Sequence, residues 1–154
     1  MAFLDDVAVR EFTQGDKDLV NAFFDGITGD AKVLFNLHDG NRKNAMRFFD
    51  GTAPNTVYFM AEYENKMIGY LFLWDIDTGV PWLGIAISEQ YRSKRLGGLL
   101  LEYARNYAAE HNKGGILLTT HIANLRGQAL YERSGYRYMG IDTSGKEFLY
   151  LLRL

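Results

Sequence analysis

The chain of 154 residues contains no cysteine and only two prolines, Pro54 and Pro81. The lack of cysteine excludes a disulfide framework, a thiolate zinc site and a cysteine nucleophile. It also fits a reducing compartment, and we expect a cytoplasmic protein. Because no proline-rich, serine-rich or low-complexity tract marks a linker, the sequence predicts a single domain over residues 1–154.

Long hydrophobic runs and a strong charge excess are lacking too. No run approaches the roughly 18 apolar residues that a membrane-spanning helix needs, and Met1–Arg10 carries two aspartates rather than the apolar core of a signal peptide. The formal net charge is -2, whereas nucleic-acid binding needs a basic face. We therefore expect neither a membrane nor a nucleic acid as a partner.

Apolar and aromatic residues are plentiful, with 47% hydrophobic residues, ten Tyr and ten Phe, enough for a substantial core or an aromatic groove. Apolar periodicity and turn residues predict the order of the elements. The predicted strands are Val7–Phe12, Val57–Tyr63, Met67–Trp74, Trp82–Ser88, Ile116–Thr120, Tyr136–Ile141 and Phe148–Leu154; the predicted helices start at Asp16 (to Gly29), Asn41 (to Phe49), Gly97 (to His111) and Asn124 (to Ser134). This order favours an α/β fold of the α+β type, a mixed, mostly antiparallel sheet flanked by helices, with a right-handed crossover at 82–120.

The most informative segment is the turn between the strand Trp82–Ser88 and the helix that starts at Gly97. It combines the free N–H groups of a helix N-terminus, paired glycines and the basic cluster Arg92, Lys94 and Arg95. These features together form an anion site suited to phosphate. The segment fits neither the G-x-x-x-x-G-K-[ST] nor the G-x-G-x-x-G motif. Its plain alternative is a solvated basic turn whose glycines pack the helix against the sheet.

Two motifs resemble the GNAT family of N-acetyltransferases. Arg92–Gly97 is similar to the family's acetyl-CoA loop [QR]-x-x-G-x-[GA], with Arg95 in place of the first glycine. Asn124–Tyr136 resembles N-x-x-A-x-x-L-Y-E-x-x-G-[FY], with Gly127 where alanine is usual. Two motifs in the right order make a chance match improbable. The resemblance covers the C-terminal half well, whereas the N-terminal half matches only in its order of elements.

The resemblance implies the GNAT acyl-CoA N-acyltransferase fold, in which two parallel strands, here Trp82–Ser88 and Ile116–Thr120, splay apart beside acetyl-CoA. It implies an enzyme that transfers the acetyl group directly to a primary amine of a small molecule, with Tyr131 assisting departure of the thiolate and no metal. The alternatives are a protein or peptide N-terminal or lysine acetyltransferase and a non-catalytic coenzyme A-binding module. The implied cofactor-binding residues are Ile85, Ala86, Ile87, Arg92, Ser93, Lys94, Arg95, Leu96, Gly97, Gly98, Asn124 and Tyr131.

Several roles stay open at this point. Spacing alone favours Tyr131 as a core residue of an amphipathic helix, and Asn124 is also explained as a helix N-cap. The general base is Asp75, Asp77, Glu89, His121 or water. Substrate selection falls to Ala31–Phe49, Asp75–Trp82 and Thr143–Lys146, where Asp39, Asp75 and Asp77 would suit a cationic amine. An unpaired edge at the last hairpin makes a homodimer plausible.

Overall fold

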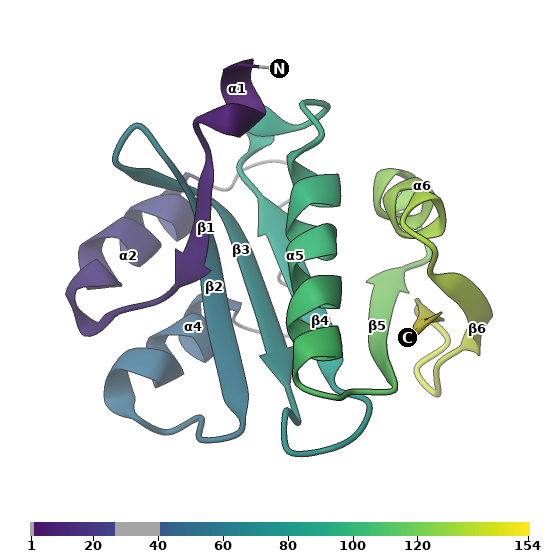
Figure 1. The fold of residues 1–154 in the computed structure, drawn as a ribbon. Helices are drawn as coiled ribbons and strands as arrows, with labels where there is room; N and C mark the ends of the chain where they lie inside the picture. Colours follow the sequence, from purple (N-terminus) through teal and green to yellow (C-terminus); the bar gives the residue numbers. More distant parts are fainter. Residues whose placement is uncertain (1, 27–40) are drawn as a thin grey trace.

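The computed structural model describes residues 2–26 and 41–154, which form one seven-stranded sheet with helices on both faces (Figure 1). The sheet order is β1-β2-β3-β4-β5-β7-β6. The elements are α1 (Ala2–Asp5), β1 (Ala8–Glu11), η1 (Gln14–Asp16), α2 (Lys17–Asp25), α4 (Asn41–Asp50), β2 (Thr56–Tyr63), β3 (Lys66–Trp74), β4 (Trp82–Ile87), η3 (Glu89–Tyr91), α5 (Leu96–Glu110), β5 (Gly115–His121), α6 (Leu125–Arg133), β6 (Arg137–Ile141) and β7 (Glu147–Arg153).

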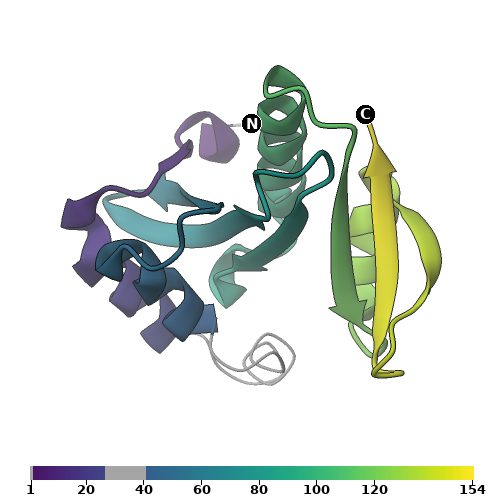
Figure 2. The same cartoon turned by 90° about the horizontal axis from the view of Figure 1, so that it is seen from below.

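This order confirms the predicted α/β fold and its sequence of strands and helices. Neighbouring strands are antiparallel except for β4 and β5, which run parallel and whose register pairs only Trp82 with Leu117. Beyond that pair the two strands diverge, so the sheet splits into a β1–β4 half and a β5–β7–β6 half. Figure 2 shows α5 on one face of the β1–β4 half and α2 and α4 on the other.

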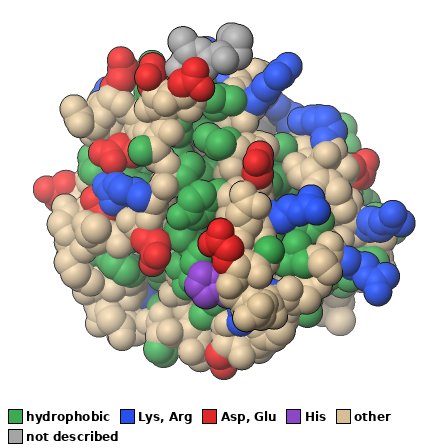
Figure 3. Space-filling view, viewed as in Figure 1, with side chains coloured by type: hydrophobic (Ala, Val, Ile, Leu, Met, Phe, Trp, Pro, Cys, Tyr) green, Lys and Arg blue, Asp and Glu red, His purple; other side chains and the backbone are tan. Residues whose placement is uncertain are grey.

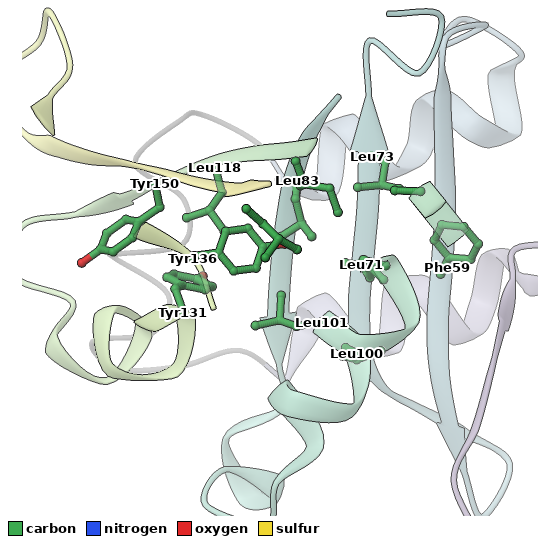
Figure 4. Close-up of a cluster of buried hydrophobic side chains, with 14 of the residues drawn as sticks. Phe59, Leu71, Leu73, Leu83, Leu100, Leu101, Leu118, Tyr131, Tyr136 and Tyr150 are labelled. Atoms are coloured by element: carbon green, nitrogen blue, oxygen red, sulfur yellow. The ribbon is translucent and has the colours of Figure 1, made fainter. Parts of the chain in front are cut away.

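Two hydrophobic clusters hold these layers together, one on each face of the sheet. On the α5 face, Leu100 and Leu101 pack among buried residues of both halves, from Phe59 to Tyr150 (Figure 4). On the α2 and α4 face the cluster is mostly aromatic: Phe12, Phe23, Phe24, Tyr58, Tyr70 and Phe72. Aromatic residues therefore fill the core on the second face, and the same cluster reaches the edge of the site described below.

Local turn chemistry explains where several elements end. Glu64 and Asn65 have φ values of +51° and +61°, which is the geometry of a tight hairpin turn between β2 and β3. Gly51 (φ +69°) follows α4, and Gly135 (φ +93°) follows α6. The end of the first predicted helix, at Gly29, and the capping role of Asp39 lie outside the described residues. Among the described residues, no helix combines the length and the apolar character needed to cross a membrane.

Asp16 differs from its prediction as the N-cap of the first helix. Its side chain makes no capping bond to α2; instead it lies buried and accepts two hydrogen bonds from the Arg10 guanidinium, at 2.8 and 2.9 Å. Arg10 also donates to Glu62 at 2.9 Å. A bidentate, charge-assisted pair is stronger than a cap, so the carboxylate ties β1 and η1 together rather than capping the helix.

This pair makes a prediction about stability. Hydrogen bonds from Arg10 hold the pKa of Asp16 at about 2, below its ordinary value. The stabilisation is therefore complete above about pH 4 and is lost as pH falls toward 2. We expect Asp16→Asn to lower the free energy of unfolding by about 2–3 kcal/mol at pH 7, with the difference from wild type vanishing near pH 2. Urea denaturation across pH measures it, with the exposed Asp18→Asn as control; a pH-independent difference would contradict the assignment.

Candidate functional site

A cleft of about 1640 Å³ opens where β4 and β5 diverge. It is lined by β4, the start of α5, the end of β5, α6, and residues of α4 and the loop after it. A pocket for one small ligand usually measures about 300–1,000 Å³. The cleft is therefore large enough to hold two reactants together.

The β4 edge of the cleft is free for an extended ligand. Ile85, Ala86 and Ile87 all line the cleft, and they lie beyond Trp82, the one β4 residue that the register pairs with β5. The backbone of these residues can therefore pair with a bound chain as an added strand would. The structure places these three predicted residues together, as the resemblance implies.

The start of α5 presents backbone N–H groups to the cleft. Arg95, which precedes the helix, has the left-handed conformation (φ +67°, ψ +15°), and its side chain makes no capping bond. The first-turn amides of a helix have no partner within it, and Leu96, Gly97 and Gly98 line the cleft. A left-handed residue followed by helical residues forms a concave nest of N–H groups, which binds anions.

Arg95 thus adopts a left-handed backbone conformation that glycine takes without steric cost. Ser93 is left-handed as well, with φ +64°. Both residues are exposed, so their side chains can leave the nest open.

The two glycines of α5 have different roles. A Cβ added at Gly97 would lie 2.7 Å from the Leu130 side chain and 3.2 Å from that of Ile87, so this glycine lets α5 pack closely against α6 and β4. A Cβ at Gly98 would meet nothing within 4 Å. Gly98 therefore leaves open space in front of the nest, where a ligand can approach the backbone.

The predicted basic cluster is divided by the fold. Arg92 and Arg95 line the cleft, whereas the Lys94 ammonium lies 5.7 Å from the centre of the Phe3 ring and Lys94 is not a lining residue. The Lys94 side chain therefore lies away from the cleft lining, and a role for its backbone N–H in holding the cofactor stays a prediction. Lysine and arginine side chains gather over the upper and right-hand parts of the face in Figure 3, near the start of α5 and over α6.

Arg126 is a basic residue of the site that the sequence reasoning missed. Its guanidinium donates a hydrogen bond of 2.6 Å to the Ser93 hydroxyl, and Arg126 lines the cleft. This contact joins the start of α6 to the loop before α5. The position of Arg126 inside the second motif was the available signal, because both helices start at the same end of the sheet.

Asn124 is the N-cap of α6, as predicted. Its Oδ1 accepts a hydrogen bond from the Gly127 N–H at 3.1 Å, and its Nδ2 donates to the Thr120 hydroxyl at 2.9 Å. A Cβ on Gly127 would lie 2.3 Å from Nδ2, so glycine replaces the family's usual alanine where the Asn124 side chain folds back over the helix. Asn124 also lines the cleft, and its amide retains one donor and one acceptor site for a ligand.

Tyr131 belongs both to the core and to the cleft. Its side chain is 7% exposed, lies 6.1 Å from the Tyr136 ring centroid to centroid, and lines the cleft. Burial raises the pKa of Tyr131 well above its ordinary value, and the charge of Glu147 raises it further. The phenol therefore stays protonated at neutral pH and can act as a hydrogen-bond or proton donor.

Glu147 is an acidic residue of the cleft that the sequence reasoning missed. It is the first residue of β7, is only 4% exposed, and lines the cleft near Tyr131. Its register partner across the sheet is His121. The prediction divided this region into a turn ending at Lys146 and a strand starting at Phe148, so Glu147 fell between them; only strand pairing brings it to the cleft.

The other candidates for the general base are separated by the fold. Asp75 and His121 line the cleft, whereas Asp77 and Glu89 are not lining residues. The His121 Nδ1 accepts a hydrogen bond from the Ala123 N–H at 3.0 Å. This contact ties the ring to the start of the segment before α6. Glu147 and Asp75 are thus the carboxylates that reach the cleft.

The far end of the cleft has aromatic and basic walls. Phe72, Trp74 and Trp82 form a stack, with ring centroids 5.3 Å apart for the first pair and 6.0 Å for the second. A Cβ on Gly84 would lie 2.3 Å from the Phe72 ring, so this glycine lets the ring lie against β4. The lining residues of α4, the loop after it and the start of β2 are Lys43, Asn44, Arg47, Ala53, Pro54, Asn55 and Thr56, and Ala53 and Trp74 pack against the same hydrophobic cluster.

The predicted substrate region is only partly in the cleft. From Ala31–Phe49 the structure places Lys43, Asn44 and Arg47 there, while residues 31–40 lie outside the described part of the chain. In the range Asp75–Trp82, the two end residues line the cleft. None of residues 143–146 is a lining residue. Within residues 2–26 and 41–154, no group of three or more acidic or histidine side chains could hold a metal ion.

Comparison with known proteins agrees with the family resemblance of the two sequence motifs. Residues 25–136 match the profile described as "Acetyltransferase (GNAT) family". The chain is 30% identical over 87 residues to the "Uncharacterized N-acetyltransferase YhfO" of Bacillus subtilis (strain 168), a match that covers 53% of this chain and 58% of that protein. It therefore spans little more than half of that relative's length.

Solved structures share the fold at low sequence identity. The GNAT domain of S. lividans PAT superposes with a TM-score of 0.83 at 15% identity, covering 96% of this chain and 90% of that one. The PaiA N-acetyltransferase of Thermoplasma acidophilum, in complex with coenzyme A, superposes with a TM-score of 0.76 at 16% identity, covering 96% and 99%. These likenesses confirm the predicted fold.

Proposed function

The chain belongs to the GNAT family of acetyltransferases, and from this premise we propose that it transfers the acetyl group of acetyl-CoA to a primary amine of a small molecule. The observation that supports this most strongly is the nest of N–H groups at Leu96–Gly98 beside the free backbone edge of Ile85–Ile87. An anion site next to an edge that can pair with an amide chain suits the diphosphate and the pantetheine of coenzyme A.

In the proposed binding mode, the nest holds the diphosphate, with Arg92, Arg95 and Arg126 around it. Guanidinium groups are suited to phosphate oxygens because they offer several N–H donors in one plane. The amides of the pantetheine arm would pair with β4 and with the free donor and acceptor sites of Asn124. No metal is part of the proposal.

In the proposed chemistry, the Glu147 carboxylate takes a proton from the incoming ammonium group. The neutral amine then attacks the thioester carbon, and backbone N–H groups near Ile85–Ile87 stabilise the oxyanion. The C–N bond forms and the C–S bond breaks. The Tyr131 hydroxyl donates a proton to the departing sulfur and regains one from the new amide nitrogen. The products are the acetylated amine, coenzyme A thiol and one released proton.

The side chains that line the β3 and α4 end of the cleft favour a small-molecule acceptor. The stacked rings of Phe72, Trp74 and Trp82 line the cleft together with residues of the helix α4 and the loop Ala53–Thr56. Such walls bury most of the surface of a small molecule and leave polar groups to orient it.

We also propose a cytoplasmic location and a single domain over residues 1–154. The exposed Tyr138, Met139 and Ile141 on the sheet-edge strand β6 support a homodimer.

The experiment that tests this function is release of thiol from acetyl-CoA across a panel of polyamines, aminoglycosides, amino acids and peptides. Because the chain has no cysteine, a thiol reagent reports only coenzyme A. We expect amine-dependent release with a small molecule. Release with peptides alone would favour a peptide acetyltransferase, and binding of acetyl-CoA without any release would favour a non-catalytic module. Sedimentation velocity on the same preparation tests the homodimer.

Arg95 provides a prediction about the cofactor loop. Arg95→Gly and Arg95→Ala both remove the guanidinium, but only glycine adopts φ +67° without cost. We expect both variants to bind acetyl-CoA about two- to fivefold more weakly, from loss of one exposed charge contact. Arg95→Gly should be more stable than Arg95→Ala by about 1 kcal/mol. Calorimetric titration and thermal denaturation measure the two effects; equal stability would show that the loop does not need the left-handed conformation.

A further inference from the structure

We propose that the acceptor amine also carries an anionic group, a carboxylate or a phosphate, which Lys43 and Arg47 of α4 bind. This inference rests on the proposed acetyl transfer and adds the class of acceptor to it. It replaces the hypothesis that acidic side chains select a purely cationic amine.

The two cations are placed by helix geometry. Lys43 and Arg47 are four residues apart on α4, so they lie on the same side of the helix. Both line the cleft, at the end where α4 packs against the cluster that includes Phe72 and Trp74. One anionic group between them can therefore contact both side chains.

Hydrogen bonds fix α4 in this orientation. Asn44, between the two cations, donates from its side chain to the Tyr70 hydroxyl at 3.1 Å, and its backbone oxygen accepts from the Tyr58 hydroxyl at 3.0 Å. The next residue, Ala45, is fully buried against the sheet. These contacts prevent the helix from rotating, so Lys43 and Arg47 remain directed to the cleft.

Arg42, the third basic residue of α4, has a structural role, in contrast to Lys43 and Arg47. Arg42 forms an ion pair with Asp25, hydrogen bonds to Asn21 at 3.0 Å and lies 5.8 Å from the centre of the Phe24 ring. It therefore joins α4 to α2. Arg47 donates one hydrogen bond to the Thr52 carbonyl at 2.6 Å, which positions its guanidinium beside the cleft and leaves four other N–H donors.

The charges along the cleft favour an acceptor with both signs. The buried carboxylate Glu147 lies near Tyr131, where the amine must react. On the acceptor side, the described lining residues contribute two cations, Lys43 and Arg47, against one carboxylate, Asp75. A polyamine would meet a net positive wall there, whereas an ammonium at Glu147 and an anion at α4 complement both ends.

The test compares acceptor pairs in which one member carries the anion and the other lacks it: L-tyrosine with L-tyrosinamide, and phosphoethanolamine with ethanolamine. We expect wild-type protein to prefer the anionic member by at least tenfold in kcat/KM. In Lys43→Glu/Arg47→Glu, the KM for that acceptor should rise at least tenfold, whereas kcat and the KM for acetyl-CoA should change little. Lys66→Glu, an exposed lysine in the β2–β3 hairpin, serves as the control.

Different outcomes would overturn the anionic acceptor and acetyl transfer itself. Turnover confined to neutral or cationic amines, or an equal loss for both members of a pair, would overturn the anionic acceptor and leave acetyl transfer standing. Absence of turnover with every amine would overturn the acetyl transfer itself, and this inference with it. Circular dichroism of the double variant shows that the helix is retained, which is expected because both side chains are exposed.

Discussion

Replacing Tyr131 with phenylalanine is expected to lower kcat by about two to three orders of magnitude and to leave the KM for acetyl-CoA nearly unchanged. The substitution removes the hydroxyl that donates to the departing sulfur but keeps the ring that packs in the core. Because the thiolate forms only as the C–S bond breaks, the hydroxyl acts on the transition state more than on binding.

Tyr136→Phe is the matched control for this measurement. Tyr136 lies next to Tyr131, and its buried hydroxyl has no hydrogen-bond partner among the described residues. Tyr136 is not a lining residue of the cleft. Its variant should keep full activity and equal or greater stability. If Tyr131→Phe retained wild-type kcat, or if both variants lost activity equally, Tyr131 would be a core residue and not the acid.

Because burial raises the pKa of Tyr131, its deprotonation should not limit the rate at any pH below about 10. If kcat fell with rising pH well below pH 10, the ionisation of another group would have to cause the fall. A solvent-exposed phenol in the same role would be half ionised at about pH 10, so a kcat that is retained at that pH distinguishes the buried phenol from an exposed one.

Glu147→Gln is expected to reduce kcat/KM for the amine by about 10²–10³-fold at pH 7. The substitution keeps the size of the side chain and removes its charge and its ability to take a proton. The loss should shrink as pH rises toward the pKa of the amine, because an increasing share of the amine is then neutral without help. The pH–rate profiles of wild type and variant measure this convergence.

Asp77→Asn is the control for Glu147→Gln, since Asp77 is a carboxylate beyond the cleft lining and should have no effect. Asp75→Asn separates the two carboxylates that reach the cleft: we expect it to change amine KM rather than kcat. A Glu147→Gln deficit of constant size across pH would contradict proton transfer and leave Glu147 with a structural role.

The parts of the site that the sequence predicted are local in the chain. The anion site follows from a strand, a turn and a helix within Ile85–Gly98, and the capping role of Asn124 from its own helix. Local patterns determine such features because the interacting groups are only a few residues apart. The family resemblance added the divergence of β4 and β5, which the single register pair of Trp82 with Leu117 confirms.

The missed features depend on tertiary contacts. Glu147 reaches the cleft only because β7 pairs with β5, and Lys43 and Arg47 only because Asn44 fixes α4 on the sheet. Asp16 fits an N-cap by sequence, yet Arg10 from the preceding strand binds it more strongly. The left-handed conformation of Arg95 is another such case, since arginine gives no local signal for positive φ.

The central claim is that the amides at the start of α5 bind the diphosphate of coenzyme A. Amide NMR spectra recorded during titration with coenzyme A test it most directly. We expect saturable binding, with the largest shifts at the N–H groups of Arg95–Gly98 and smaller ones along Ile85–Ile87. Saturable binding that leaves these amides unshifted, or no binding at millimolar ligand, would contradict it.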